Sequence, residues 1–399
     1  MNALDVALVA AAVWFAVIGY RQGFVIGISS VLGLIGGGVI AIYVLPLIWR
    51  EVADRPDPGR TGAVAAVAVV LLCATVGQAL TTHLGTRLRQ RITWTPARAL
   101  DATGGALVNV LALLLVAWLL GSALATSTLG TVGREVRGSR VLLGVSRVVP
   151  ESADTWFAGF SAVMAQQGLP QVFSPFADEP ITEVPAPDPA VARSPAIDRA
   201  RRSIVRVAGT APGCGKVLEG TGFVFSEGRV MTNAHVVGGV TDPTVQVGGQ
   251  GRRYAARVVL YDWERDVAVL DVPRLDAPAL RVSRGDAITG DDAVIAGFPQ
   301  SGPFDARPAR VRERFQADGP DIYRRGTVSR DVYSLRGTVR PGNSGGPLLT
   351  PDGEVFGVVF AKSLDDEETG YALTADEVRE TITRGRAADE PVDSQSCAM

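Results

Sequence analysis

Four long apolar stretches near the N-terminus constrain this chain most. They cover residues 3–20, 24–48, 62–82 and 104–126. Each is close to the roughly 20 residues that a helix needs to cross the hydrocarbon core of a bilayer. The first stretch does not fit a cleaved signal peptide, because it lacks a basic leader and more apolar stretches follow it. The sequence therefore predicts an all-α transmembrane bundle of four spans over residues 1–128, with the lipid bilayer as its surroundings.

The arginines that flank these stretches predict the orientation of the bundle. The loops at 21–23 and 83–103 hold five arginines together, whereas the loop at 49–61 holds three. Basic loops tend to stay in the cytoplasm, so the first two loops are expected there. Three arginines at 134–140 count against this assignment. We expect a multi-pass protein of the plasma (inner) membrane, with both the N-terminus and the C-terminal domain on the periplasmic side.

Small and polar residues inside the apolar stretches have two interpretations each. Gly23 and Gly27 form one pair spaced by four residues, and Gly33 and Gly37 form another. Such pairs let helices pack closely in lipid, although glycine is also simply common there. Three polar residues lie in or near the stretches, namely Asp5, Gln78 and Asn109. Polar groups in a membrane are often functional, so a transport role is one hypothesis; a place for Asp5 at the interface is the other.

Three short motifs mark this half of the chain. They are Asn2-x-x-Asp5, Arg21-Gln22-Gly23-Phe24-x-x-Gly27 and Leu100-Asp101-x-x-Gly104. In these motifs the half resembles the CvpA (colicin V production) family of small four-span proteins.

Residues 129–199 are predicted to connect the apolar half of the chain to the part that follows. Apolar residues recur at helical spacing over 151–167, which predicts an amphipathic helix that packs on the rest of the protein or on the membrane. Residues 174–197 then hold six prolines among acidic and small residues. This composition predicts an extended, semi-rigid spacer. A cut in the spacer would release whatever follows it.

From about residue 200 the pattern changes to short β-branched runs separated by Gly, Pro and Asp. The runs are 203–207, 222–225, 244–247, 256–261, 267–272, 293–297, 326–332 and 355–360. Many short strands at this spacing predict an all-β barrel or sandwich. The arginine-rich stretch 305–325 is expected to be a solvated loop, with a regulatory or self-cleavage loop as the alternative.

Three longer motifs follow one another in this part. They are Thr221-Gly222-Phe223-Val224-Phe225 with Val230-Met231-Thr232-Asn233-Ala234-His235-Val236-Val237, then Asp262-x-x-x-Asp266-Val267-Ala268-Val269-Leu270, then Arg340-Pro341-Gly342-Asn343-Ser344-Gly345-Gly346-Pro347-Leu348-Leu349. Over residues 200–383 the chain thus resembles the chymotrypsin-like serine proteases, and among them the HtrA-like branch. The resemblance implies a protease domain over 200–399 with two perpendicular six-stranded β-barrels and the catalytic residues in the cleft between them.

The chemistry of these residue types supports a catalytic triad of Ser344, His235 and Asp266. A serine hydroxyl is a weak nucleophile until a neighbouring base removes its proton. The chain has two histidines, and His83 lies at the end of an apolar stretch, so His235 is the available base. A carboxylate must then orient the imidazole, and Asp266 is expected to do so, with Asp262 as the competitor.

The resemblance also implies the parts of a substrate cleft. The backbone N–H groups of Gly342 and Ser344 would form the oxyanion hole. Thr338, six residues before the serine, would lie at the base of the S1 pocket. Its walls would come from the strand that starts at Gly357 and from Ala361-Lys362-Ser363. Because Thr338 carries no charge, we expect a small or uncharged P1 residue.

The cysteines and the charge balance limit the remaining possibilities. Cys73 is expected to be a buried free thiol, whereas Cys214 and Cys397 are either a disulfide or two thiols. A disulfide is favoured if this domain lies outside the cytoplasm. The net charge of −2 offers no general case for nucleic acid binding. Two histidines and scattered cysteines provide no set of metal ligands, so neither a metal nor another cofactor is predicted.

The combination of the two halves with cysteines at 214 and 397 resembles the membrane-bound acid-resistance serine proteases of mycobacteria and related actinobacteria. This resemblance implies an endopeptidase that cleaves envelope proteins, with the chain itself as a further candidate substrate, and that supports survival under acid stress. The HtrA-like branch usually carries a C-terminal PDZ domain, and none is expected here, so no PDZ-mediated partner is predicted. The competing hypothesis is a transport or scaffold protein whose β-domain binds peptides without cutting them.

Overall fold

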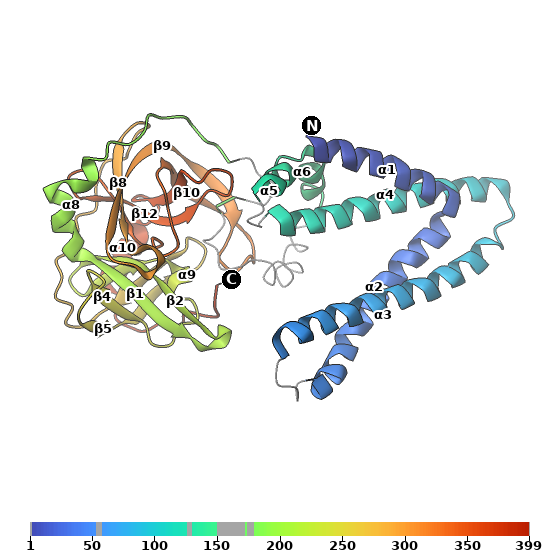
Figure 1. Ribbon diagram of the computed structural model, residues 1–399, viewed down its shortest axis with the longest axis horizontal. Helices are drawn as coiled ribbons and strands as arrows, with labels where there is room; N and C mark the ends of the chain where they lie inside the picture. Colours follow the sequence, from blue (N-terminus) through green and yellow to red (C-terminus); the bar gives the residue numbers. More distant parts are fainter. Residues whose placement is uncertain (1, 53–57, 126–129, 150–171, 174–178, 399) are drawn as a thin grey trace. The chain divides into compact units, whose positions relative to one another are not determined.

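The structure is a computed structural model that describes residues 2–52, 58–125, 130–149, 172–173 and 179–398 (Figure 1). The chain splits into two compact units. One unit comprises Met1–Gly121 and Ser139–Val148, and the other comprises Ser122–Gly138 and Val149–Met399. The second unit also includes the short helix α5 (Gly130–Arg137). The helix predicted at 151–167 lies outside the described residues.

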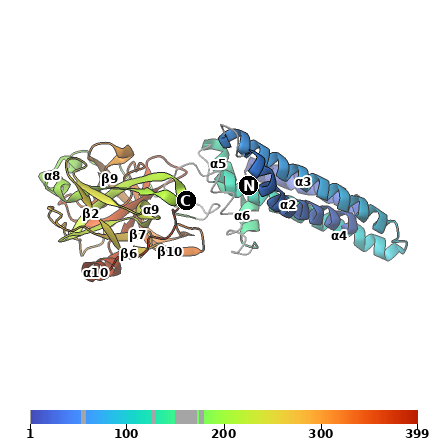
Figure 2. The same cartoon turned by 90° about the horizontal axis from the view of Figure 1, so that it is seen from below.

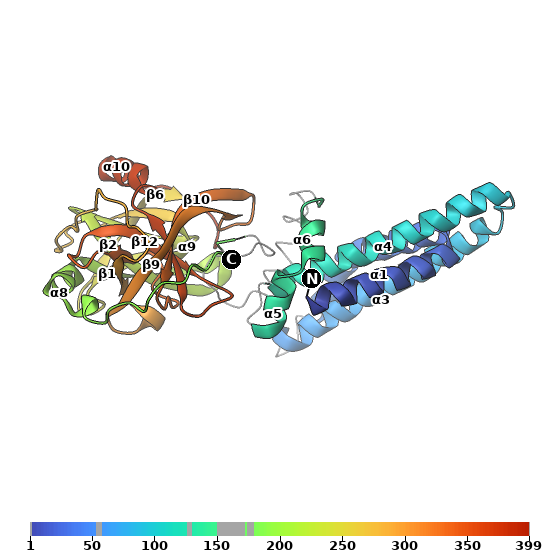
Figure 3. The same cartoon turned by 90° about the horizontal axis from the view of Figure 1, so that it is seen from above.

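The first unit is a bundle of long helices. They are α1 (Ala3–Gln22), α2 (Phe24–Val52), α3 (Pro58–Arg89) and α4 (Thr95–Ala125), with the short α6 (Arg140–Ser146) after them. Helix α1 packs along α4, and α2 packs along α3 (Figures 1 and 3). Among the described residues, three segments are long and apolar enough to cross a membrane: Ala3–Gln22, Phe24–Ala41 and Thr95–Ser122. The span expected at 62–82 lies within α3 and stays a prediction.

Glycines set how closely these helices approach. A Cβ atom on Gly33 would collide with the Gly77 backbone, and one on Gly37 would collide with the Cys73 backbone. The Gly33–Gly37 pair therefore permits close contact between α2 and α3. Gly23 acts differently: its φ of +84° forms the turn between α1 and α2, a conformation that glycine adopts without strain.

Two of the aspartates in the CvpA-like motifs hold helix ends. Asp101 accepts hydrogen bonds from the backbone N–H of Val25 at 3.0 Å and from Arg89 Nε at 2.7 Å. Asp5 accepts one from Ser139 Oγ at 2.6 Å and one from the Val141 N–H at 3.2 Å. Carboxylates near the first turn of a helix satisfy its free N–H groups. Asp5 thus ties α1 to α6, a structural role that the sequence did not indicate.

The second unit contains two antiparallel β-structures. The first sheet has the order β5-β4-β1-β2-β3-β7-β6, and the second barrel is closed, with the order β10-β13-β12-β11-β8-β9. Strands of the first sheet are β1 (Ile204–Ala211), β2 (Lys216–Ser226), β3 (Arg229–Thr232), β4 (Thr244–Val247), β5 (Arg253–Ala255), β6 (Arg257–Asp262) and β7 (Val267–Asp271). Strands of the second barrel are β8 (Asp292–Gly297), β9 (Asp305–Pro320), β10 (Thr327–Arg336), β11 (Pro347–Leu349), β12 (Val355–Lys362) and β13 (Thr369–Thr374).

These strands confirm the all-β prediction for the C-terminal half. Each of the eight predicted runs overlaps one strand. Branched side chains such as Val205, Val224 and Leu270 are fully buried and fill the core of the first sheet. The first sheet has seven strands rather than six, because the three-residue β5 adds an edge beside β4.

The arginine-rich stretch was expected to be a loop, and this expectation is wrong. Residues 305–320 form β9, which pairs with β8 and with β10. Neighbouring strands supply carboxylates for its arginines: Arg310 binds Asp292 at 2.6 Å and Arg314 binds Asp331 at 2.5 Å. Opposite charges on adjacent strands stabilise the pairing, so the arginines do not prevent a strand here.

Short helices complete the second unit. Helix α8 (Pro195–Ala200) precedes β1, and the single-turn α9 (Ala234–Val237) follows β3. Helix α10 (Arg379–Ala387) lies beside β6 and β7 (Figure 2).

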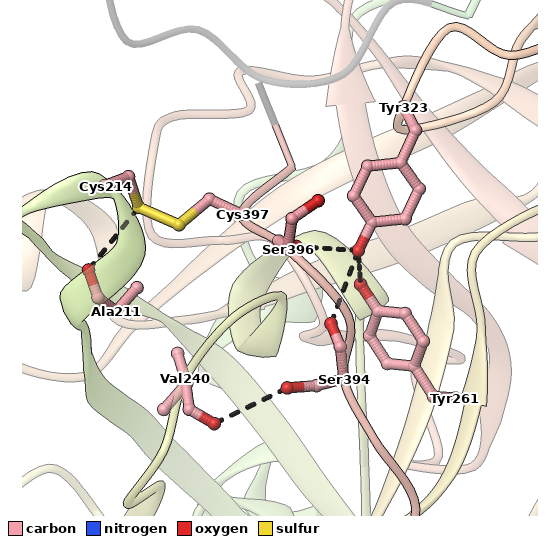
Figure 4. The surroundings of a disulfide bond; sticks show 8 residues. All are labelled: Ala211, Cys214, Val240, Tyr261, Tyr323, Ser394, Ser396 and Cys397. Atoms are coloured by element: carbon pink, nitrogen blue, oxygen red, sulfur yellow. Dashed lines mark hydrogen bonds between the residues drawn. A yellow bond between two sulfur atoms is a disulfide. The ribbon is translucent and has the colours of Figure 1, made fainter.

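The C-terminal tail returns from α10 across the first sheet. The Val392 N–H donates to Val258 O at 2.8 Å. The Tyr323 hydroxyl lies 2.6 Å from that of Tyr261 and donates to Ser396 O at 2.8 Å. The tail then ends in a disulfide between Cys214 and Cys397, as predicted (Figure 4). The tail is thus fastened to β6 and to the residues between β1 and β2.

Replacing Cys397 by alanine should destabilise the C-terminal half. The disulfide spans 183 residues, and a loop of this length stabilises the fold by about 5 kcal/mol at most in the chain-entropy model. Thermal unfolding of the full chain in detergent, without reductant, measures the change. C73A is the control because Cys73 is a free cysteine in α3. Equal midpoints for C397A and C73A would contradict the prediction.

Candidate active site

His235 is held at the end of β3 by its neighbours in the sequence. It lies in α9, directly after β3. Val236 and Val237 are buried in the core of the first sheet, whereas 18% of the His235 side chain stays exposed. The apolar neighbours therefore anchor the turn while the imidazole reaches the surface, where a substrate has access to it.

Asp266 provides the carboxylate for this histidine. Its Oδ2 lies 2.7 Å from His235 Nδ1, and its Oδ1 accepts a hydrogen bond from the His235 backbone N–H at 2.9 Å. Asn233 Nδ2 donates to the Asp266 carbonyl at 2.7 Å. Asp266 is fully buried and has a φ of +61°, a conformation that is costly for residues other than glycine. Both ends of the residue are thus fixed against the histidine segment.

The competing Asp262 serves another purpose. Its Oδ1 accepts a hydrogen bond from the Arg265 backbone N–H at 2.9 Å, and its Oδ2 lies 3.4 Å from Arg265 Nη1. It therefore closes the turn that leads to Asp266. The structure brings Asp266, and not Asp262, to the imidazole.

Ser344 lies in a tight turn between β10 and β11. The Asn343 N–H donates to Arg340 O at 2.9 Å, and the Arg340 N–H donates to Asn343 Oδ1 at 2.9 Å. Gly342 and Gly345 have φ values of +96° and +80°, so glycine suits both positions. Ser344 Oγ is buried and has no hydrogen-bond partner within the described part of the chain.

The serine turn packs directly on the segment that carries His235. A Cβ atom on Gly345 would collide with Thr232 and Asn233, the two residues just before α9. The Thr221 N–H of β2 donates to Ser344 O at 2.8 Å, and the Gly345 N–H donates to Val359 O at 2.8 Å. The second barrel thus presents Ser344 beside the His235–Asp266 pair of the first sheet.

The backbone of Pro341 and Gly342 suits an oxyanion hole. Pro341 O accepts a hydrogen bond from the Gln300 N–H at 2.7 Å. In a trans peptide the C=O and the N–H point in opposite directions, so the Gly342 N–H points away from Gln300. Among the described residues, neither the Gly342 nor the Ser344 N–H has a protein acceptor. Both donors are available to a substrate oxygen.

The expected S1 residues are only partly brought together. Thr338 is half-buried, and its neighbour Val339 packs on Gly370 of β13. Ala361 pairs with Tyr371 at the same end of β13. Gly357 pairs with Leu348 and Thr374 instead, roughly 13 Å along the strand from Ala361 at about 3.3 Å per residue. Ala361 and the neighbour of Thr338 therefore lie at the same end of β13, and Gly357 lies at the other end.

Sequence reasoning missed three residues that support the site. Thr221 Oγ1 donates to Gly342 O at 2.6 Å and accepts from the Phe298 N–H at 3.0 Å. Asn233 and Gln300 hold Asp266 and Pro341 as described above. Thr221 and Asn233 lie within the recognised motifs, so the motifs offered a signal for both. Gln300 lies outside these motifs, so the sequence offered no signal for it.

Comparisons with known proteins agree with this arrangement in both halves. The family model of the trypsin-like peptidase domain matches residues 220–358. The model of colicin V production protein matches residues 4–150. The serine protease Rv3671c of Mycobacterium tuberculosis is 39% identical over 396 residues, which cover 99% of this chain and 98% of that protein. The human serine protease HTRA4 is 33% identical over 42% of this chain and 34% of its own length.

A solved structure supports the same conclusion for the C-terminal half. The crystal structure of the active form of the Rv3671c protease shares 46% identity with this chain and covers 57% of it and 100% of its own chain, with a TM-score of 0.54. Because Rv3671c is 39% identical over nearly the whole length of both proteins, the chain is a serine protease and belongs to the family, represented by Rv3671c, that joins a colicin V production domain to a trypsin-like peptidase domain.

Proposed function

We propose that this enzyme cleaves peptide bonds of envelope proteins with a triad of Ser344, His235 and Asp266. The observation that carries the proposal is the 2.7 Å contact between His235 Nδ1 and Asp266 Oδ2, together with a buried Ser344 hydroxyl that has no hydrogen-bond partner in the described structure. A peptide-binding scaffold needs neither a paired histidine nor an available hydroxyl.

The geometry supports a stepwise reaction. Ser344 Oγ attacks the carbonyl carbon of the peptide bond while His235 Nε2 takes the hydroxyl proton. Asp266 stabilises the imidazolium and keeps Nδ1 protonated. The imidazolium then gives its proton to the leaving amine. Water hydrolyses the remaining acyl-serine ester in the same way.

The Gly342 and Ser344 N–H groups would stabilise the negative oxygen of the tetrahedral intermediate. Preorganised donors of this kind typically contribute about 3–4 kcal/mol each to the lowered barrier. For the S1 site, we keep the proposal of a small or uncharged P1 residue, because Thr338 is neutral and Val339 fills space against Gly370.

The protease half is proposed to face the periplasmic side of the membrane. Disulfides persist in oxidising compartments, and the Cys214–Cys397 bond agrees with the orientation that the flanking arginines predict. A role in acid and stress survival is proposed from the resemblance to acid-resistance proteases.

D266N should lower kcat/KM by on the order of 10⁴, because the wrong imidazole tautomer then faces the serine. Hydrolysis of a peptide substrate by the full chain in detergent measures this loss. D262N is the matched control, since Asp262 ends β6 four residues before Asp266 and binds Arg265 instead. Similar losses for both variants would contradict the assignment of Asp266.

S344A should abolish covalent labelling by a fluorophosphonate, because the probe reacts only with an activated serine. Peptide hydrolysis should fall with it. S334A is the control, since Ser334 is equally buried, on β10. In-gel fluorescence of the folded full chains measures the outcome. A labelled S344A, or an unmodified chain that is never labelled, would overturn the proposed function.

The four-span topology should place residues 55 and 148 outside the cytoplasm and residue 94 inside it, since α3 and α4 would then each cross the bilayer. Alkaline phosphatase fused after each position reports this, because it is active only outside the cytoplasm. Equal activity at 55 and 94 would show that α3 does not cross, and activity at 94 alone would reverse the orientation.

A further inference from the structure

The connector is docked on the second barrel. We use the name docked connector for residues 172–173 and 179–184. Val172 is 4% exposed and belongs to the barrel's apolar core. The Phe173 ring stacks on Phe315 of β9 at 5.8 Å between centroids and meets Tyr371 of β13 edge-on at 5.5 Å. These contacts are those of a domain core rather than of a free spacer.

Two arginines of the second barrel hold the next part of the docked connector by its backbone. Arg312 Nη1 donates to Thr182 O at 2.8 Å, and Arg336 Nη1 donates to Val184 O at 2.7 Å. Arg312 is 2% exposed. Backbone carbonyls bound in this way fix the path of the segment, whatever side chains it carries.

Glu179 binds three hydrogen-bond donors of the second barrel. Its carboxylate accepts hydrogen bonds from Ser363 Oγ, from the Leu364 N–H at 3.1 Å and from the Tyr371 hydroxyl at 3.1 Å. Burial raises the pKa of this carboxyl, and the charge of Asp365 raises it further. A carboxylate is kept in such surroundings only with several donors.

The partners of Glu179 belong to the proposed S1 wall. Ser363 ends the Ala361–Ser363 segment, and Tyr371 is the cross-strand partner of Ala361. Gly370, next to Tyr371, packs on Val339 beside Thr338. Tyr371 and Ser363 are 0% and 4% exposed. Glu179 therefore contacts this wall from the docked connector.

We propose that Glu179 is a positioning residue that sets P1 specificity, by holding Ser363 and Tyr371 in the S1 wall from outside the protease domain. The inference rests on the proposed function, which it deepens. Without the carboxylate, two buried hydroxyls and the Leu364 N–H lose their partner. The wall then relaxes, and the selection and binding of the P1 side chain change, while the triad, which Glu179 does not touch, stays in place.

The test compares E179A with E183A in the full chain in detergent. Glu183 lies on the same segment, but its side chain is 85% exposed. For E179A we expect KM for the preferred peptide to rise about tenfold, the size typical of a lost buried partner. Its P1 preference in a peptide mixture should broaden, while fluorophosphonate labelling of Ser344 stays within about twofold of the unmodified rate, since losing that contact does not disturb the triad. E183A should match the unmodified chain in all three measurements.

A double-mutant cycle with Y371F shows whether Glu179 acts through the wall. Y371F removes only the hydroxyl that binds Glu179, so the double variant should show the KM effect of the larger single variant rather than the product of both. The inference would be overturned if the KM effects of E179A and Y371F multiplied in the double variant. It would also be overturned if E179A were labelled and showed unchanged KM and P1 preference. If E179A does not fold, Y371F and S363A decide the question by the same criteria. Failure of the unmodified chain to label would instead contradict the proposed function.

Discussion

The bond between the buried Asp266 carboxylate and His235 is the interaction on which the rest of the site depends. A charge without solvent contact is costly unless hydrogen bonds surround it. Here both carboxylate oxygens bind His235, one through the ring and one through the backbone N–H. The unfavourable φ of Asp266 is held by Asn233. One residue thus joins the start of β7 to α9, and the imidazole is oriented before any substrate arrives.

The serine turn depends on the same segment from the other side. Because Gly345 has no Cβ, the turn from the second barrel lies directly against Thr232 and Asn233. Thr221 of β2 then bonds to both Gly342 and Ser344 through its hydroxyl and its N–H. The proposed nucleophile and its proposed base come from different β-structures, and these short contacts position one relative to the other.

The sequence predicted the strands and site residues that local residue chemistry determines. It missed the features that depend on contacts with residues distant in the sequence. Branched runs identified eight strands because burial on a sheet selects such residues. Motif residues predicted the pairing of His235 with Asp266 because few other residue types suit this chemistry, and the structure brings these two together. The strand at 305–320 was missed because its arginines indicated a solvated loop. Only the structure shows that Asp292 and Asp331 on neighbouring strands pair with Arg310 and Arg314. Gln300 was missed because its backbone N–H, not its side chain, holds Pro341.

The connector shows the same limit most clearly. Six prolines indicated an extended spacer, yet Thr182 and Val184 lie on the barrel because Arg312 and Arg336 bind their carbonyls, and residues 191–193 and 195–200 form short helices. A segment held by its backbone needs no recognisable side-chain pattern. One side chain on it, Glu179, meets buried donors of the proposed S1 wall. If this contact positions the wall as proposed, the segment that leads from the membrane domain is also a component of the substrate site, and cleavage of the connector on either side of Glu179 would have different consequences for specificity.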